Sequence, residues 1–138
     1  MTRTPRIEDM PRLEGILVLV VDDSPDVLAH VTNILEQRGA TVAAVGSADE
    51  ALQIVERERP NVVLSDLAMP DKGGYWLIGK IRGLPPEHGG RVPAAALTPY
   101  TGPEHRASVL RAGFQHHVAK PVEAHHLVGV VSMLALRG

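Results

Sequence analysis

The chain has 138 residues, of which 44% are hydrophobic and 22% are charged, and its formal net charge is −2 at pH 7. This length fits one globular domain with its own core, and the weak negative charge argues against a nucleic-acid partner. The absence of cysteine excludes disulfide frameworks and thiolate chemistry and suits the cytoplasm. No apolar run approaches the roughly 20 residues that span a bilayer. We expect a cytoplasmic protein that contacts neither nucleic acid nor membrane.

The first twelve residues differ from the remainder of the chain. Met1 to Arg12 contains two prolines and lacks the apolar core of a signal peptide. We therefore predict a flexible N-terminal leader over residues 1–12, followed by one domain over residues 13–138.

The first half of this domain alternates between short apolar runs and helical patterns. The apolar runs predict buried strands because they are brief and continuous. Ser24 and Ser47 supply side-chain caps at two helix starts, and Gly39 ends the first of these helices. Strand, helix, strand and helix are expected in turn over residues 16–21, 25–38, 41–45 and 48–59.

The second half continues the alternation. Its first strand ends on Asp66, and the following loop is broken by Pro70. Strands are expected over residues 62–66, 92–97 and 114–119, and helices from 74, over 103–112 and from about 123. Five strand–helix pairs in strict alternation predict an α/β fold: a doubly wound five-stranded parallel sheet with helices on both faces.

Acidic side chains stand at the ends of two of the predicted strands. Asp22 and Asp23 follow the first strand, and Asp66 ends the third. If these strands are neighbours, three carboxylates converge and repel one another unless a cation lies among them. Oxygen ligands in a partly wet cleft suit Mg²⁺. A single acid here is explained by helix capping, but three acids at two strand ends favour a metal site.

A hydroxyl and an ammonium are expected at the same edge of the sheet. Thr98 ends the fourth strand and Lys120 follows the fifth. Together with the carboxylates, they form a site for an anion that arrives with Mg²⁺, of which a phosphoryl group is the simplest. Asp66 is its simplest acceptor, because aspartate forms acyl phosphates.

At this point the chain resembles the receiver domain of two-component response regulators, which has a flavodoxin-like fold. The resemblance covers about residues 13–136, and residues 84–87 and 112–123 are most similar to receivers of hybrid sensor histidine kinases. It rests on these motifs in this order: Val21-Asp22-Asp23, Asp66 to Pro70 with Gly73-Gly74, Leu97-Thr98 and Lys120-Pro121.

The resemblance implies a role for each site residue. Asp66 would accept a phosphoryl group from a histidine kinase or a histidine phosphotransfer domain. Thr98 would turn to hydrogen-bond this group and Lys120 would pair with it, and the bond from Lys120 to Pro121 would be cis. The domain would promote only its own phosphorylation and dephosphorylation, and its downstream partner is not specified.

The resemblance also implies a Mg²⁺ site and a partner-binding face. Asp23 and Asp66 would bind Mg²⁺ directly, Asp22 through water, and Ala68 through its backbone carbonyl. The helix after Gly102, the last strand and the last helix would form the face that binds partners. Its apolar candidates are Val109, Leu110, Val118 and Val130, of which Val118 and Val130 fit the core equally well.

Two of the departures from the family pattern bear on switching. Pro99 follows Thr98, where receivers usually have a small residue whose N–H helps to hold the phosphoryl group. Either that donor is missing here or the loop is shifted. His117 stands where receivers usually carry a switch tyrosine or phenylalanine; an imidazole can still rotate, but it titrates near neutral pH.

These departures motivate a second hypothesis, an atypical receiver that acts as a phosphorylation-independent protein-interaction module. A third hypothesis is an aspartyl-nucleophile phosphohydrolase, but those enzymes usually carry a second acid where this chain has Ala68. A flavodoxin-like cofactor binder is disfavoured because no phosphate-binding loop follows the first strand. We predict a phosphoacceptor signalling domain rather than an enzyme.

Overall fold

The computed structural model describes residues 6–137 and contains a five-stranded parallel sheet with the strand order β2-β1-β3-β4-β5. Each strand begins and ends close to its predicted position, and the predicted doubly wound fold is confirmed. The strands are β1 Leu17–Val21, β2 Thr41–Val45, β3 Val62–Asp66, β4 Ala94–Thr98 and β5 His116–Ala119.

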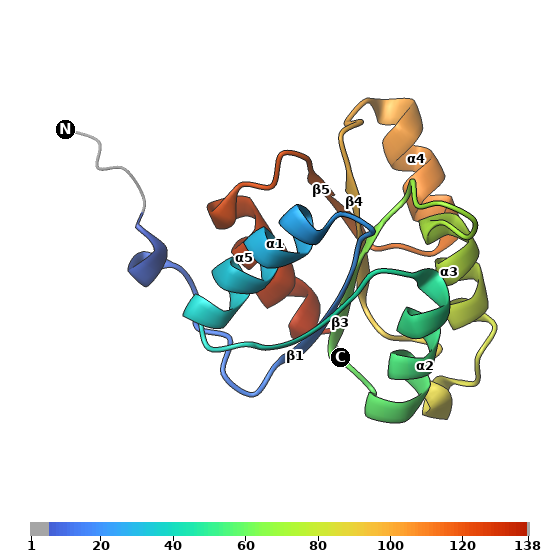
Figure 1. Ribbon diagram of the computed structural model, residues 1–138, viewed down its shortest axis with the longest axis horizontal. Helices are drawn as coiled ribbons and strands as arrows, with labels where there is room; N and C mark the ends of the chain where they lie inside the picture. Colours follow the sequence, from blue (N-terminus) through green and yellow to red (C-terminus); the bar gives the residue numbers. More distant parts are fainter. Residues whose placement is uncertain (1–5, 138) are drawn as a thin grey trace.

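Helices cover both faces of the sheet (Figure 1). On one face lie α1 (Pro25–Gln37) and α5 (Ala124–Ala135). On the other face lie α2 (Ala48–Glu58), α3 (Gly74–Arg82) and α4 (Pro103–Ala112). Two short 3₁₀ turns, Ile7–Asp9 and Pro86–His88, complete the secondary structure of the described residues.

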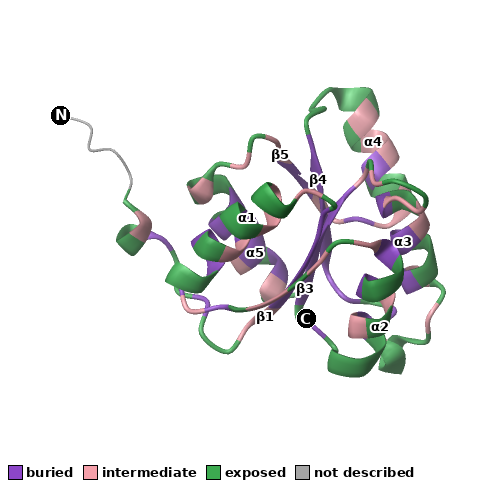
Figure 2. Ribbon diagram, in the orientation of Figure 1, coloured by how far each residue is buried: buried purple, intermediate pink, exposed green. Residues whose placement is uncertain are grey.

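The sheet separates two apolar layers, which explains why the strands are apolar along their whole length. In β1, Val18 and Val20 pack toward α1 and α5, whereas Leu19 and Val21 pack toward α2, α3 and α4. All four side chains are fully buried. Figure 2 shows this arrangement as buried strands between helices that are exposed on their outer surfaces. A strand buried on both faces needs this continuous pattern.

The predicted helix caps are present. Ser24 Oγ accepts a hydrogen bond from the Val27 N–H at 3.3 Å at the start of α1. At the start of α2, Ser47 Oγ accepts from the Glu50 N–H at 3.3 Å and donates to Glu50 Oε1 at 2.9 Å, which completes the capping box. These bonds satisfy backbone donors that the helices leave free at their first turns.

Strands β4 and β5 begin two residues later than the sequence pattern predicts. Pro93 has no N–H to donate to the sheet, so β4 begins at Ala94. Phe114 lies between the two elements: its N–H donates to the Val109 carbonyl after the end of α4, and β5 begins only at His116. Its side chain is buried, which explains its apolar character.

The expected apolar character of the partner-binding face is largely wrong. Val109, Val118 and Val130 are buried in the core, and only Leu110 is exposed, at 49%. The alternative assignment of Val118 and Val130 to the core is therefore confirmed.

Part of the expected N-terminal leader contacts the domain. Met10 is buried, and the Arg38 guanidinium donates to the carbonyls of Met10 and Pro11 at 2.8 and 3.2 Å. Residues 1–5 of the leader lie outside the described residues, and its boundary with the domain stays a prediction. Between residues 6 and 137, every helix is too short or too polar to cross a bilayer.

Candidate functional site

The predicted site residues meet at the carboxyl edge of the sheet. Parallel strands end at the same edge, and the register between neighbours brings Asp22, Asp66, Thr98 and Lys120 to adjacent strand ends. The paired residues nearest this edge are Val21 with Ser65, Asp66 with Leu97, and Thr98 with Ala119.

The loop after β3 folds back against the strand that it leaves. Gly74 donates its N–H to the Leu67 carbonyl at 3.1 Å. A Cβ atom at Gly74 would lie 2.4 Å from the Asp66 carbonyl oxygen, which is closer than any side chain tolerates. Glycine is therefore required here, and the close approach fixes the backbone that carries Asp66.

Three carboxylates converge at this edge, as predicted. Asp22, Asp23 and Asp66 each offer one oxygen atom, and these atoms lie within 4.8 Å of one another. Asp22 and Asp66 are 1% and 5% exposed, whereas Asp23 is exposed at the rim. A cluster of oxygen ligands with one side open to water fits Mg²⁺, which retains several waters when proteins bind it. The role of the Ala68 carbonyl stays a prediction.

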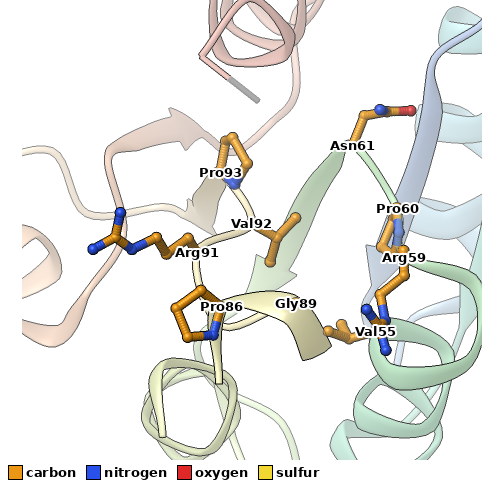
Figure 3. A pocket seen from close by; sticks show the side chains of 9 residues that line it. All are labelled: Val55, Arg59, Pro60, Asn61, Pro86, Gly89, Arg91, Val92 and Pro93. Atoms are coloured by element: carbon orange, nitrogen blue, oxygen red, sulfur yellow. The ribbon is translucent and has the colours of Figure 1, made fainter. Parts of the chain in front are cut away.

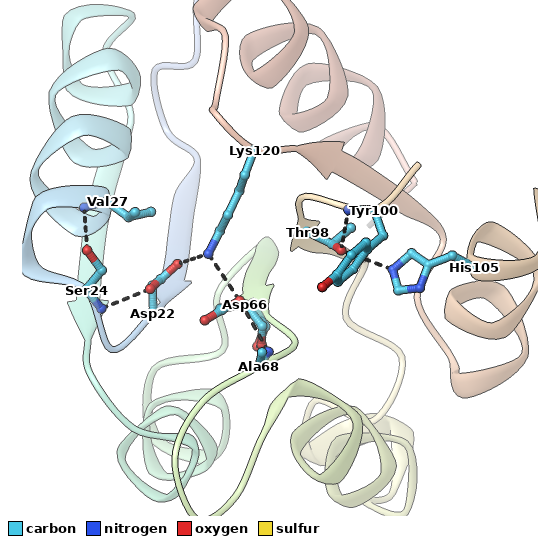
Figure 4. A network of polar contacts seen from close by, with 10 residues as sticks. Asp22, Ser24, Val27, Asp66, Ala68, Thr98, Tyr100, His105 and Lys120 are labelled. Atoms are coloured by element: carbon cyan, nitrogen blue, oxygen red, sulfur yellow. Dashed lines mark hydrogen bonds and ion pairs between the residues drawn. The ribbon is translucent and has the colours of Figure 1, made fainter. Parts of the chain in front are cut away.

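Lys120 joins the two buried carboxylates (Figure 4). Its Nζ atom lies 2.8 Å from Asp22 Oδ2 and 3.1 Å from Asp66 Oδ1. Burial lowers the pKa of Lys120, but hydrogen bonds with both carboxylates outweigh burial and raise its pKa overall. The expected cis bond between Lys120 and Pro121 is confirmed.

The negative charge of the Asp66 carboxylate is disfavoured, because the pKa of this group is raised. Burial raises its pKa, the charge of Asp22 raises it further, and the hydrogen bond from Lys120 only partly offsets these effects. The N–H of Ala68 adds a hydrogen bond to Asp66 Oδ1 at 3.3 Å. Because one ammonium serves two carboxylates, an additional cation at this site is favourable.

The Thr98 hydroxyl does not point to Asp66. Thr98 is 1% exposed, and its Oγ1 atom hydrogen-bonds His105 Nε2, 3.0 Å away in α4. The Tyr100 N–H donates to the same oxygen at 3.1 Å, as Figure 4 shows. His105 was not among the predicted site residues. The helix start at Pro103 places His105 in the first turn of α4, but it does not tell which way that turn faces relative to Thr98.

His117 occupies β5 and is 7% exposed. Burial lowers the pKa of this histidine, and the positive charge of Arg106 lowers it further. The lowered pKa favours the neutral imidazole over the charged imidazolium in the folded protein. Its role as a switch stays a prediction.

A hollow of about 290 Å³ lies away from this site, at the amino ends of β3 and β4 (Figure 3). Its lining is mostly apolar, and its charged side chains are Arg59 and Arg91. The carboxylates and Lys120 lie at the opposite ends of the strands, so the candidate site and the hollow are separate.

The sequence matches a known protein family. The model of the response regulator receiver domain matches residues 18–132, most of the chain. This chain is a member of the response regulator receiver domain family. Receiver domains are signalling domains of two-component systems, so the resemblance found from the motifs is confirmed.

Individual relatives agree with this assignment. An uncharacterized 14.6 kDa protein of Leptolyngbya boryana is 42% identical over 92% of this chain and 95% of that protein. The sensor histidine kinase GacS of Pseudomonas protegens is 34% identical over 87% of this chain, which spans only 14% of the kinase.

One similar solved structure contains a metal ion. It is the receiver domain of the sensor histidine kinase PA1611 of Pseudomonas aeruginosa, with a magnesium ion in its active site cleft. It is 30% identical, has a TM-score of 0.79, and covers 88% of this chain and 98% of its own.

Proposed function

We propose that this receiver domain accepts a phosphoryl group on Asp66 from the phosphohistidine of a histidine kinase or a histidine phosphotransfer domain. The reaction depends on Mg²⁺, takes place in the cytoplasm, and changes how the domain binds a downstream protein. The observation that carries the proposal is the buried Asp66 carboxylate at the open edge of the sheet, where Lys120 Nζ contacts both Asp66 and Asp22.

One oxygen of Asp66 is available for the reaction. Oδ1 accepts hydrogen bonds from Lys120 and from the Ala68 N–H, whereas Oδ2 has no hydrogen bond within residues 6–137. We assign Oδ2 as the atom that attacks phosphorus. The new O–P bond forms as the N–P bond to the donor imidazole breaks, and that imidazole takes up a proton. Lys120 holds the carboxylate and offsets negative charge on the arriving group.

Asp22, Asp23 and Asp66 would hold Mg²⁺, together with the Ala68 carbonyl, with Asp22 acting through water. Bound Mg²⁺ would supply positive charge that lowers the repulsion between the phosphoryl group and the carboxylates. The donor set fits this ion because it consists of oxygen atoms and because Asp23 keeps it open to water. The domain acts on its own aspartate and turns over no separate substrate.

A second candidate function is favoured by the geometry around Thr98. Its hydroxyl is bonded to His105, and the next residue, Pro99, has no N–H to donate to a phosphoryl group. A receiver with these features that binds partners without phosphorylation is the alternative.

Intact-mass measurement after incubation with acetyl phosphate and Mg²⁺ tests the proposal. We expect a single phosphoryl adduct in the wild type, and none in Asp66→Asn or in the presence of EDTA. Asp71→Asn is the matched control, because Asp71 is exposed in the same loop and should leave the adduct unchanged.

A folded wild-type protein that binds Mg²⁺ but forms no adduct would contradict the proposal and support the binding-module alternative. In that case Pro99→Ala becomes the informative variant. Recovery of an adduct in Pro99→Ala would identify the missing backbone donor as the cause.

A further inference from the structure

The side chain of Thr98 is held away from the proposed phosphorylation site. We infer that His105 is a positioning residue: it keeps the Thr98 hydroxyl on the α4 side of the sheet edge while Asp66 is unphosphorylated. This inference rests on the proposed function, because it concerns how Thr98 becomes available to a phosphoryl group on Asp66.

The first support is the contact itself. Thr98 Oγ1 and His105 Nε2 are 3.0 Å apart, and the Tyr100 N–H donates to Oγ1 at 3.1 Å. Because Thr98 is only 1% exposed, water has little access to replace either bond. A hydrogen bond that solvent cannot replace biases the direction of the hydroxyl more strongly than an exposed one.

The second support is the placement of the His105 side chain. It lies in the first turn of α4, after Gly102 and Pro103 at the helix start. Its ring packs edge-to-face against Tyr100, with ring centroids 5.5 Å apart and an angle of 68° between the planes. The imidazole is therefore fixed by the helix on one side and by an aromatic ring on the other (Figure 4).

The third support is the position of Thr98 relative to Asp66. Leu97, the residue before Thr98, is the partner of Asp66 in the pairing of β3 with β4. Redirection of the hydroxyl therefore requires a change of side-chain rotamer at the strand end rather than a shift of the strand. The bond to His105 and a bond to a phosphoryl group are alternatives for the same oxygen. Loss of the bond to His105 should therefore favour the bond between Thr98 and a phosphoryl group on Asp66.

The test uses beryllofluoride, a stable mimic of a phosphoryl group bound to aspartate, and measures its affinity by calorimetry in saturating Mg²⁺. His105→Phe keeps an aromatic ring beside Tyr100 but removes the hydrogen bond, and His105→Ala removes both. We expect both variants to bind beryllofluoride about threefold to tenfold more tightly than the wild type, which corresponds to one net hydrogen bond. The initial rate of phosphorylation by acetyl phosphate should rise in the same direction.

Three controls separate positioning from a general structural effect. His125→Ala removes an exposed imidazole from α5 and should leave the affinity unchanged. The affinity for Mg²⁺ alone should not change in the His105 variants, because Thr98 is not a ligand. In a Thr98→Ala background, substitution of His105 should have no further effect, since the two side chains act as a pair. Thermal melting verifies that each variant is folded.

Unchanged or weaker beryllofluoride binding in folded His105→Phe would overturn the inference while the proposed function stands. An equal gain in the Thr98→Ala background would also overturn it. If the wild type neither binds beryllofluoride nor accepts a phosphoryl group, the proposed function fails and the inference falls with it.

Discussion

Asp22, Asp66 and Lys120 show how a charged site is built inside an otherwise apolar sheet. The lysine contacts both buried carboxylates, yet the pKa of Asp66 stays above its ordinary value because burial and the neighbouring Asp22 outweigh the lysine. A buried site that retains uncompensated negative charge gains from any cation that enters it. These residues thus favour the binding of a metal ion.

His117 leads to a prediction about pH. The pKa of this histidine is lowered by burial first and by the charge of Arg106 second. The unfolded chain takes up a proton near the ordinary histidine pKa of about 6.5, whereas the folded chain resists it. His117 therefore contributes most to the free energy of unfolding above the pKa of the unfolded chain. This contribution is lost as the pH falls from there toward the lower pKa of the folded chain. Protonation of a neighbouring histidine lowers the pKa of His117 in the same direction; the neighbours are His116, His126 and His105.

His117→Phe should remove this loss. Urea unfolding between about pH 7.5 and 5 should show that the free energy of unfolding falls less steeply in the variant than in the wild type. His88→Phe changes an exposed histidine and should retain the wild-type slope. Identical slopes in His117→Phe and the wild type would contradict the assignment of a neutral imidazole.

At the scale of secondary-structure elements, the capped helix starts were predictable, whereas the starts of β4 and β5 were placed two residues too early. Ser24 and Ser47 cap α1 and α2 as their spacing indicates. The predicted start of β5 is too early because the apolar Phe114 was read as a strand residue. Its side chain is buried in the core, but its N–H donates to the Val109 carbonyl at the end of α4.

The same contrast holds at the site. The carboxylates and Lys120 were predictable because strand ends of a parallel sheet share an edge. The bond from Thr98 to His105 was not, since sequence spacing does not tell how α4 is rotated relative to β4.

The capping box of α2 gives a prediction at this scale. Ser47→Ala removes the acceptor for the Glu50 N–H and should lower the free energy of unfolding by about 1 kcal/mol. Urea denaturation measures this change. Ser108→Ala is the matched control, because Ser108 lies within α4, where alanine is a good helix former and the change should be close to neutral. Equal effects at both serines would refute the role of the cap.

At the scale of the whole molecule, occupancy of the site should govern stability. A ligand that binds only the folded state adds about 2.7 kcal/mol at a concentration of one hundred times its Kd. For a domain of this size we expect Mg²⁺ at that concentration to raise the Tm by roughly 10 °C. EDTA should reverse the increase, and Asp23→Asn should greatly reduce it.

Differential scanning calorimetry with and without Mg²⁺ measures this effect. Asp26→Asn removes an exposed acid from the first turn of α1 and should keep the full response to Mg²⁺. A response in Asp23→Asn as large as that of the wild type would contradict the proposed ligand set.

The ion pair between Lys120 and Asp22 joins residues 98 positions apart, so it ties the end of β5 to the end of β1. Closing such a distant pair is slow relative to local helix formation, because most of the chain must be ordered first. During synthesis, the strand with the acids emerges before the lysine. A ribosome-bound chain that stops before Lys120 therefore cannot assemble the charge balance around Asp66, and this balance forms only after all five strands have been made.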